Sequence, residues 1–330
     1  MGAILCTTPL KDGRQRLELP NGELAVQQIP AAPVLPPTAT IKDTTLLQRQ
    51  HGGLKRGKWG TGTSSRLGRS SCSPPARRLR RTRTFFLWND GAVSKVAAAG
   101  DPAPGGGSFW AIGTERIGFV DGTTMPTGPL GAINDVGLIS FRGYVTGGEA
   151  LAGIFRSDGK THEWYVRHGD PTPMGGTYAD FAAPSLNNAG QVAFFADVSI
   201  GSTLTSGWFA GSPDDWRKAI AFYDVVDGGQ VIGLAYSRNP LTPLNDSGRL
   251  LLWATLRTTG GDRERLLISE PDGSLSIAAR QGDATPFGGQ IGNIHPWPSL
   301  NNDGQGTVSA ATPGAPGVFN AYMTFQPCLP

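Results

Sequence analysis

Asn187-Asn188-Ala189-Gly190 is one of four Asn-x-x-Gly segments, and the distances between successive segments are 53, 58 and 56 residues. An aliphatic residue precedes each Asn, and a short strand-like run follows each Gly. A nearly fixed period is typical of solenoids, propellers and arrays. Asn and Gly both suit turns, so the pattern predicts a turn that leads into a strand. The expected structural turn residues are Asn134, Gly137, Asn187, Gly190, Asn245, Gly248, Asn301 and Gly304.

A second motif precedes the Asn-x-x-Gly segments. In the second unit it reads Gly169-Asp170-Pro171-Thr172-Pro173-Met174-Gly175-Gly176, and similar runs begin at Gly100 and Gly282. The third unit keeps only Asp224 and a Gly pair. Asp-Gly turns between apolar runs, such as Ser157-Asp158-Gly159, predict hairpins between the two motifs.

Three or four antiparallel strands per unit is the content of a propeller blade. The sequence therefore predicts an all-β fold, a small propeller-like ring of about four antiparallel blades. We expect residues 85–100 to pair with residues 304–325, because that pairing would remove the exposed strand edges. An open β array and an edge-paired oligomer are the alternatives.

The repeat resembles the NxxGxxxAF tandem-repeat proteins of bacteria. Their core couples a Gly-Asp-Pro-x-Pro-Gly-Gly stretch to a Pro-Ser-Leu-Asn-x-x-Gly-x-x-Ala-Phe stretch, and Pro184–Phe194 matches the second stretch in full. Unit four departs at Val308, unit three lacks the Gly-Asp-Pro run, and unit one carries an insertion before Asn134. The resemblance covers about residues 85–325. It implies a secreted or surface-attached repeat protein of unassigned role and supplies no catalytic residues.

Residues 1–84 differ in composition from residues 85–330, which form the expected four-unit repeat domain. The first part holds 15 Lys/Arg and 4 Asp/Glu, a net charge of +11, whereas the second holds 14 and 22, a net charge of −8. A Pro-, Gly-, Ser- and Arg-rich segment of this kind is typical of a disordered basic leader. Two alternatives remain: a spurious N-terminal extension, and a basic arm that binds nucleic acid through Arg77–Arg83.

The loops between the two motifs predict one shared face. Exposed aromatic side chains beside carboxylates would suit sugars or a cation, so this face is a candidate binding site for an extracellular polysaccharide or a protein. The alternative is that each Asp caps a turn and that the aromatic residues wedge blades together. The candidate binding residues are Asp101, Trp110, Asp170, Tyr178, Asp224, Tyr236, Asp283 and Trp297.

Motifs for catalysis, metals and cofactors are missing from the sequence. The four His residues form no HExxH pair, the three Cys residues give no metal-ligand spacing, and no Gly-x-Ser-x-Gly elbow or phosphate loop is present. No apolar run approaches the length of a membrane span, and Met1–Cys6 is too short to form a signal peptide. We therefore expect no cofactor, no catalytic residues and no bound metal.

The sequence favours a non-catalytic repeat protein with a structural or surface-display role. A carbohydrate- or protein-binding propeller is the alternative, and a propeller-type hydrolase or lyase is a second one, because propellers host acids near their central channel. Only the family resemblance indicates a secreted or cell-surface location.

Overall fold

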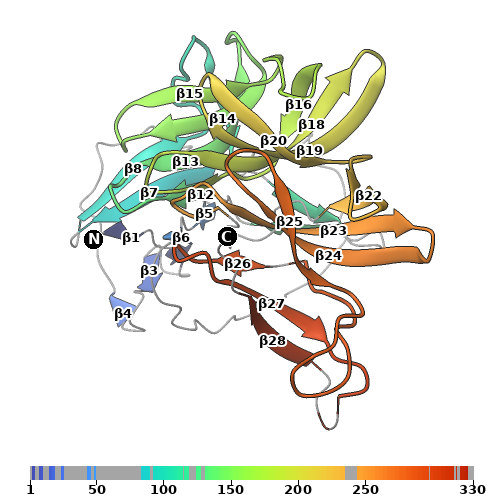
Figure 1. The fold of residues 1–330 in the computed structure, drawn as a ribbon. Helices are drawn as coiled ribbons and strands as arrows, with labels where there is room; N and C mark the ends of the chain where they lie inside the picture. Colours follow the sequence, from blue (N-terminus) through green and yellow to red (C-terminus); the bar gives the residue numbers. More distant parts are fainter. Residues whose placement is uncertain are drawn as a thin grey trace, which may run out of the picture.

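The computed structural model describes residues 83–89, 92–113, 115–118, 124–127, 131–234, 244–296, 298–315, 317 and 320–325, together with short strands before residue 50. All regular elements in these residues are strands, which confirms the all-β prediction (Figure 1). No helix in the described part of the chain has the length and apolarity that a membrane crossing needs.

The short early strands are β1 (Gly2–Ala3), β2 (Thr7–Pro9), β3 (Gln15–Glu18), β4 (Leu24–Ala25), β5 (Asp43–Thr45) and β6 (Gln48–Arg49). The prediction of a disordered leader otherwise falls outside the described residues.

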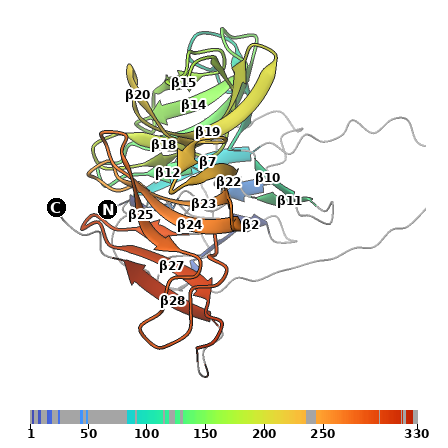
Figure 2. The same cartoon turned by 45° about the vertical axis from the view of Figure 1, so that its right-hand side comes forward.

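Blade 1 sets the pattern that the other units follow. Its central strand, β13, pairs on one edge with two short strands, β9 and β12. On the other edge it pairs with β14, which in turn pairs with β15. The hairpin β10–β11 lies between β9 and β12 and corresponds to the expected insertion in unit one; it projects from the side of the molecule in Figure 2. The strands are β9 (Ser108–Ile112), β10 (Glu115–Gly118), β11 (Thr124–Thr127), β12 (Gly131–Ile133), β13 (Ile139–Thr146), β14 (Ala152–Ser157) and β15 (His162–Arg167).

Blade 2 repeats this order. In blades 3 and 4 the strand after Asn-x-x-Gly is again flanked by strands on both edges, but blade 3 adds β21 beside β22, and blade 4 has three described strands. Blade 2 contains β16 (Thr177–Phe181), β17 (Ser185–Leu186), β18 (Val192–Ile200), β19 (Thr203–Ser212) and β20 (Asp215–Ala221). Blade 3 contains β21 (Val225–Val226), β22 (Gly229–Leu234), β23 (Leu250–Thr258), β24 (Gly261–Ser269) and β25 (Leu275–Arg280). Blade 4 contains β26 (Ser299–Leu300), β27 (Gly306–Ala311) and β28 (Asn320–Phe325).

The four sheets follow one another around a ring that resembles a four-bladed propeller (Figure 1). Buried clusters fill the spaces between successive sheets. Neighbouring residues of β18 point into different clusters, Phe194 toward blade 1 and Phe195 toward blade 3. Leu251 and Leu252 of β23 divide in the same way between blades 4 and 2. Because side chains alternate along a strand, each central strand buries both of its faces.

The expected pairing of residues 85–100 with residues 304–325 is wrong. Strand β7 (Arg83–Asn89) pairs with β8 (Ala92–Ala98), β1 and β5, whereas the only partner of β28 among the described strands is β27. The reason is that the edge of β7 opposite β8 already pairs with β1 and β5. The β7–β8 hairpin packs on blade 1 instead, where the Phe85 and Phe141 ring centroids lie 5.3 Å apart.

The predicted role of Asn-x-x-Gly as a turn is confirmed in all four units. In unit 2 the Gly190 N–H donates to the Asn187 carbonyl at 3.1 Å, and the Asn187 side-chain oxygen accepts the Gln191 N–H at 2.8 Å. Gly190 has a φ of 81°, a left-handed value that Gly adopts without steric cost.

The Asn side chains also join the units to one another, which the sequence does not indicate. The side-chain amide of each Asn donates to the backbone carbonyl of the next Asn, at 3.0, 3.0 and 3.2 Å. We call this chain of bonds, formed by Asn134, Asn187, Asn245 and Asn301, the asparagine ladder. A parallel set joins the following residues: the backbone N–H groups of Asp135, Asn188 and Asp246 donate to the Oδ1 atoms of Asn188, Asp246 and Asn302.

We expect Asn187→Ala to lower the free energy of unfolding by about 2–4 kcal/mol. The substitution removes three side-chain hydrogen bonds at a fully buried position, each worth about 0.5–1.5 kcal/mol, and leaves buried groups unpaired. The measurement is urea denaturation followed by fluorescence.

The matched control is Asn301→Ala. Asn301 is exposed at the end of the ladder, and among the described residues its side chain bonds only to Gln305, so we expect a loss of about 1 kcal/mol. Equal losses in the two variants would contradict a stabilising role for the ladder.

Candidate functional site

The repeated aspartates act as turn caps. In every unit one carboxylate oxygen accepts the backbone N–H of the residue three positions earlier, at 2.8 Å: Asp101 from Ala98, Asp170 from Arg167, Asp224 from Ala221 and Asp283 from Arg280. In three units the other oxygen pairs with a cation, from Lys95, Arg167 or Lys218. These contacts support the turn-cap interpretation of the four aspartates.

The Gly pair that follows each Asp is also structural. Gly176 has a φ of 74°, and a Cβ placed on it would lie 2.2 Å from the Ser199 carbonyl oxygen. Gly107 and Gly289 meet the backbone of their own blades in the same way. A side chain at these positions would force the loop away from the blade.

The predicted aromatic residues do not share one exposed face. Trp110 is 53% exposed, as a binding residue would be, but Tyr178 is only 1% exposed, which corrects the prediction for Tyr178. The backbone explains its burial: Tyr178 donates to the Asp170 carbonyl, and its own carbonyl accepts from Gly169. Phe109, Val231 and Ile291 make the equivalent bonds, so this position belongs to the core. Tyr236 and Trp297 lie outside the described residues.

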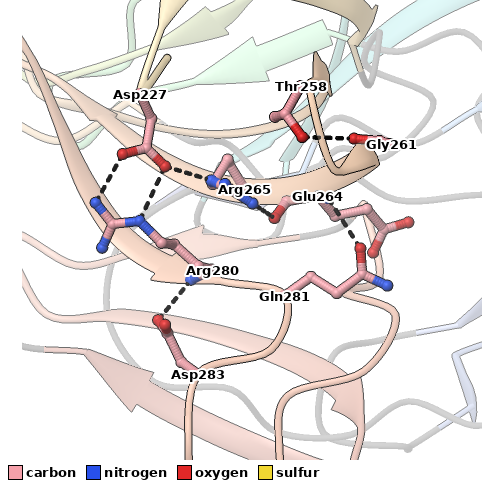
Figure 3. Close-up of polar contacts among 8 residues, drawn as sticks. All are labelled: Asp227, Thr258, Gly261, Glu264, Arg265, Arg280, Gln281 and Asp283. Atoms are coloured by element: carbon pink, nitrogen blue, oxygen red, sulfur yellow. Dashed lines mark hydrogen bonds and ion pairs between the residues drawn. The ribbon is translucent and has the colours of Figure 1, made fainter. Parts of the chain in front are cut away.

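Sequence reasoning missed a charged cluster on blade 3, shown in Figure 3. Asp227 lies in the turn between β21 and β22 and accepts hydrogen bonds from Arg265 at 2.6 Å and from Arg280 at 2.8 and 2.9 Å. The Arg280 hydrogen bond, helped by Arg265 and opposed by burial, lowers the Asp227 pKa to about 2. The one signal available was Asp227-Gly228-Gly229, the altered copy of the Gly-Asp motif.

The hydrogen bonds around this cluster join residues of blade 3 to one another. Arg265 also donates to the Glu264 carbonyl, and the Glu264 N–H donates to the Gln281 side chain at 3.1 Å (Figure 3). Burial raises the pKa of the Glu264 carboxyl above its ordinary value. Because both guanidinium groups bind Asp227, the cluster ties the β21–β22 turn to β24 and β25.

A second cluster, of which the sequence analysis named only Trp110, joins blades 1 and 2. Arg142 of β13 donates to both carboxylate oxygens of Asp180 on β16, at 2.8 and 2.9 Å. The Arg142 guanidinium lies 4.6 Å from the centroid of the Tyr144 ring, and Trp110 meets Tyr144 at 5.9 Å with an interplanar angle of 84°. We call Trp110, Arg142, Tyr144 and Asp180 the seam cluster. None of the four belongs to a repeated motif, so the repeat gave no signal for them.

The described residues contain no group of three or more His, Cys, Asp or Glu that could hold a metal ion. Among these residues, His295 and Ser309 come closest to a pair of base and nucleophile: the His295 Nδ1 lies 2.6 Å from the Ser309 hydroxyl. These two residues are also joined through their backbones across neighbouring strands, which accounts for the contact.

Fold and site together define an all-β repeat protein with a propeller-like ring. A model of a family of unknown function (DUF7453) matches residues 80–321, and the chain belongs to this family. The match spans all four Asn-x-x-Gly segments and the seam cluster. No curated protein matches the chain.

We expect Tyr178→Phe to raise the free energy of unfolding by about 1 kcal/mol. The Tyr178 hydroxyl is buried and has no hydrogen-bond partner among the described residues, and a buried unpaired polar group costs about 1–3 kcal/mol. Unit 1 holds Phe109 at the equivalent position, so the ring is accommodated there. Urea denaturation provides the measurement, with Phe109→Tyr as the destabilising control. A loss of stability in Tyr178→Phe would show that the hydroxyl is paired.

We expect Asp227→Asn to destabilise the protein by about 1–3 kcal/mol at pH 7, because it removes the charge that faces the buried Arg265. The folded-state pKa of Asp227 is depressed, so its stabilisation is fully present above pH ~4, the ordinary value, and is lost as the pH falls toward 2. Melting temperatures of both proteins at pH 7, 4 and 2 provide the measurement. A difference that persists undiminished at pH 2 would contradict the ion-pair assignment.

Proposed function

We propose that this chain is a non-catalytic repeat protein with a structural or surface-display role. The observation that carries the proposal is that the described residues of both repeated motifs have structural tasks. The Asn residues close turns and join units, the Asp residues cap turns, and the Gly pairs pack against backbone. A catalytic role for the repeated Asn or Asp side chains would require them to leave the hydrogen bonds that they make within the fold.

We propose a location outside the cell, on the cell surface or in the secreted fraction. The support is the resemblance of Pro184–Phe194 to the NxxGxxxAF tandem-repeat proteins, which implies a bacterial source as well. An extracellular body of this kind would meet polysaccharides and the surfaces of other proteins, and these are the partners we propose.

Binding of a polysaccharide or a protein through the loop face is the second candidate function. One observation favours it: Trp110 is 53% exposed and its ring contacts Tyr144, whose hydroxyl lies 3.3 Å from the Asp180 carboxylate. A hydrolase or lyase has weaker support, because each of the four repeated aspartates already bonds within its own turn.

The experiment compares wild type with Asp170→Ala and Asp283→Ala. We expect each variant to lose about 1–2 kcal/mol of stability through the missing cap, and we expect no turnover of chromogenic glycosides or esters by any of the three proteins. Urea denaturation and absorbance assays provide the measurements.

The opposite pattern would overturn the proposal: turnover by the wild type that is lost in a variant of unchanged stability. Labelling of intact producing cells with a membrane-impermeant biotin reagent tests the location. Labelling that occurs only after lysis would contradict an extracellular role.

A further inference from the structure

Trp110 owes its exposure to a β-bulge. In the pairing of β9 with β13, Phe109 faces Val145 and Ala111 faces Tyr144, so Trp110 is the extra residue of the bulge. Bulges re-aim side chains and are over-represented beside functional sites. The same bulge recurs in the first strand of units 2 and 3, where the extra residues are Ala179 and Ile232. The scaffold therefore repeats the bulge, and only unit 1 uses it to present a large aromatic ring outward.

The neighbours of Trp110 give this ring a polar border. The Asp180 side chain is 42% exposed, whereas the Arg142 side chain that holds it is largely buried. Asp180 is fixed further by the Phe181 N–H, which donates to it at 2.9 Å. Asp180 also accepts the Tyr144 hydroxyl at 3.3 Å, so at most one of the about four acceptor positions of this carboxylate is left for a ligand. The exposed Trp110 indole and the Asp180 carboxylate thus contact the same residue, Tyr144, through its ring and its hydroxyl respectively.

The charges of the seam cluster limit the ligand class. An anion would be repelled by the exposed Asp180 carboxylate. A cation would compete with Arg142, which already neutralises Asp180 and occupies the face of Tyr144 at 4.6 Å. A neutral ligand that has hydroxyl donors and an apolar C–H face suits both the carboxylate and the indole, because such a face stacks on an aromatic ring.

We propose that the seam cluster binds a neutral polysaccharide, with Trp110 stacking on a sugar ring and Asp180 accepting its hydroxyl protons. Arg142 is a positioning residue that orients Asp180, and Tyr144 supports both Arg142 and Trp110. This site rests on the second candidate function and narrows its partner to one class.

The test is affinity electrophoresis of the full chain in native gels that contain barley β-glucan, arabinoxylan, galactomannan, anionic alginate or cationic chitosan. We expect retardation in at least one of the three neutral gels, and none in alginate or chitosan. Trp110→Ala should weaken binding by about tenfold or more, and Trp110→Phe should lose less, because it keeps an aromatic face.

The matched control is Tyr322→Ala. Tyr322 is an 86% exposed aromatic residue on β28, away from the seam cluster, and its removal should leave retardation unchanged. Circular dichroism and urea denaturation check that each variant is folded.

Three outcomes would overturn the site: no retardation in any neutral gel, retardation only in alginate or chitosan, or equal retardation of wild type and Trp110→Ala. Reducing ends released in the neutral gels give a separate readout. Release of reducing ends would overturn the non-catalytic proposal but would not contradict the binding site. Absence of binding without such release would overturn the binding site but would not contradict the non-catalytic proposal.

Discussion

The backbone carbonyl of Asn187 closes its own turn and holds the neighbouring unit at the same time. It accepts the Gly190 N–H within the turn and the side-chain amide of Asn134 from the preceding unit. A unit that loses its turn therefore loses its neighbour as well, so local order and ring assembly are coupled through one buried atom. Since a buried polar group without a partner is costly, distortion at Asn187 also affects the units on both sides. The arrangement of the blades in the ring depends on these hydrogen bonds between neighbouring units.

A second bulge strengthens the same junctions. The last strand of units 1, 2 and 3 carries one extra residue, which in unit 1 is Tyr165. The Tyr165 hydroxyl donates to the Gly190 carbonyl, so strand β15 reaches the turn of the next unit. Arg217 of β20 reaches Gly248 in the same way. The β7–β8 hairpin has the matching bulge at Val96, so it resembles the last two strands of units 1 to 3. It packs on blade 1 because each such pair packs on the unit that follows.

The sequence predicted what depends on local backbone chemistry. Asn-x-x-Gly turns and Asp-Gly hairpins follow from the conformations that Asn, Asp and Gly adopt, so Gly190 and the β14–β15 turn were predictable from one unit alone. The ladder was not, because a side-chain bond over 53 residues has no local signature. Tyr178 was misplaced because its burial depends on which way the strand faces. The seam cluster joins residues from different units, and only the folded ring brings Arg142 to Asp180.

The four units differ at a position where the residue of unit 1 is not explained by stability alone. Five residues after the motif Gly, unit 1 has Arg142, and units 2 to 4 have Phe195, Trp253 and Ser309. Phe195 fills this place with apolar packing in the core between blades 2 and 3. A largely buried ion pair is often no more stabilising than hydrophobic residues of similar volume. Stability alone therefore gives little reason for Arg142 and Asp180 at the seam. A binding site supplies that reason, because the pair fixes a carboxylate beside Trp110, where the other units place Ala179 or Ile232.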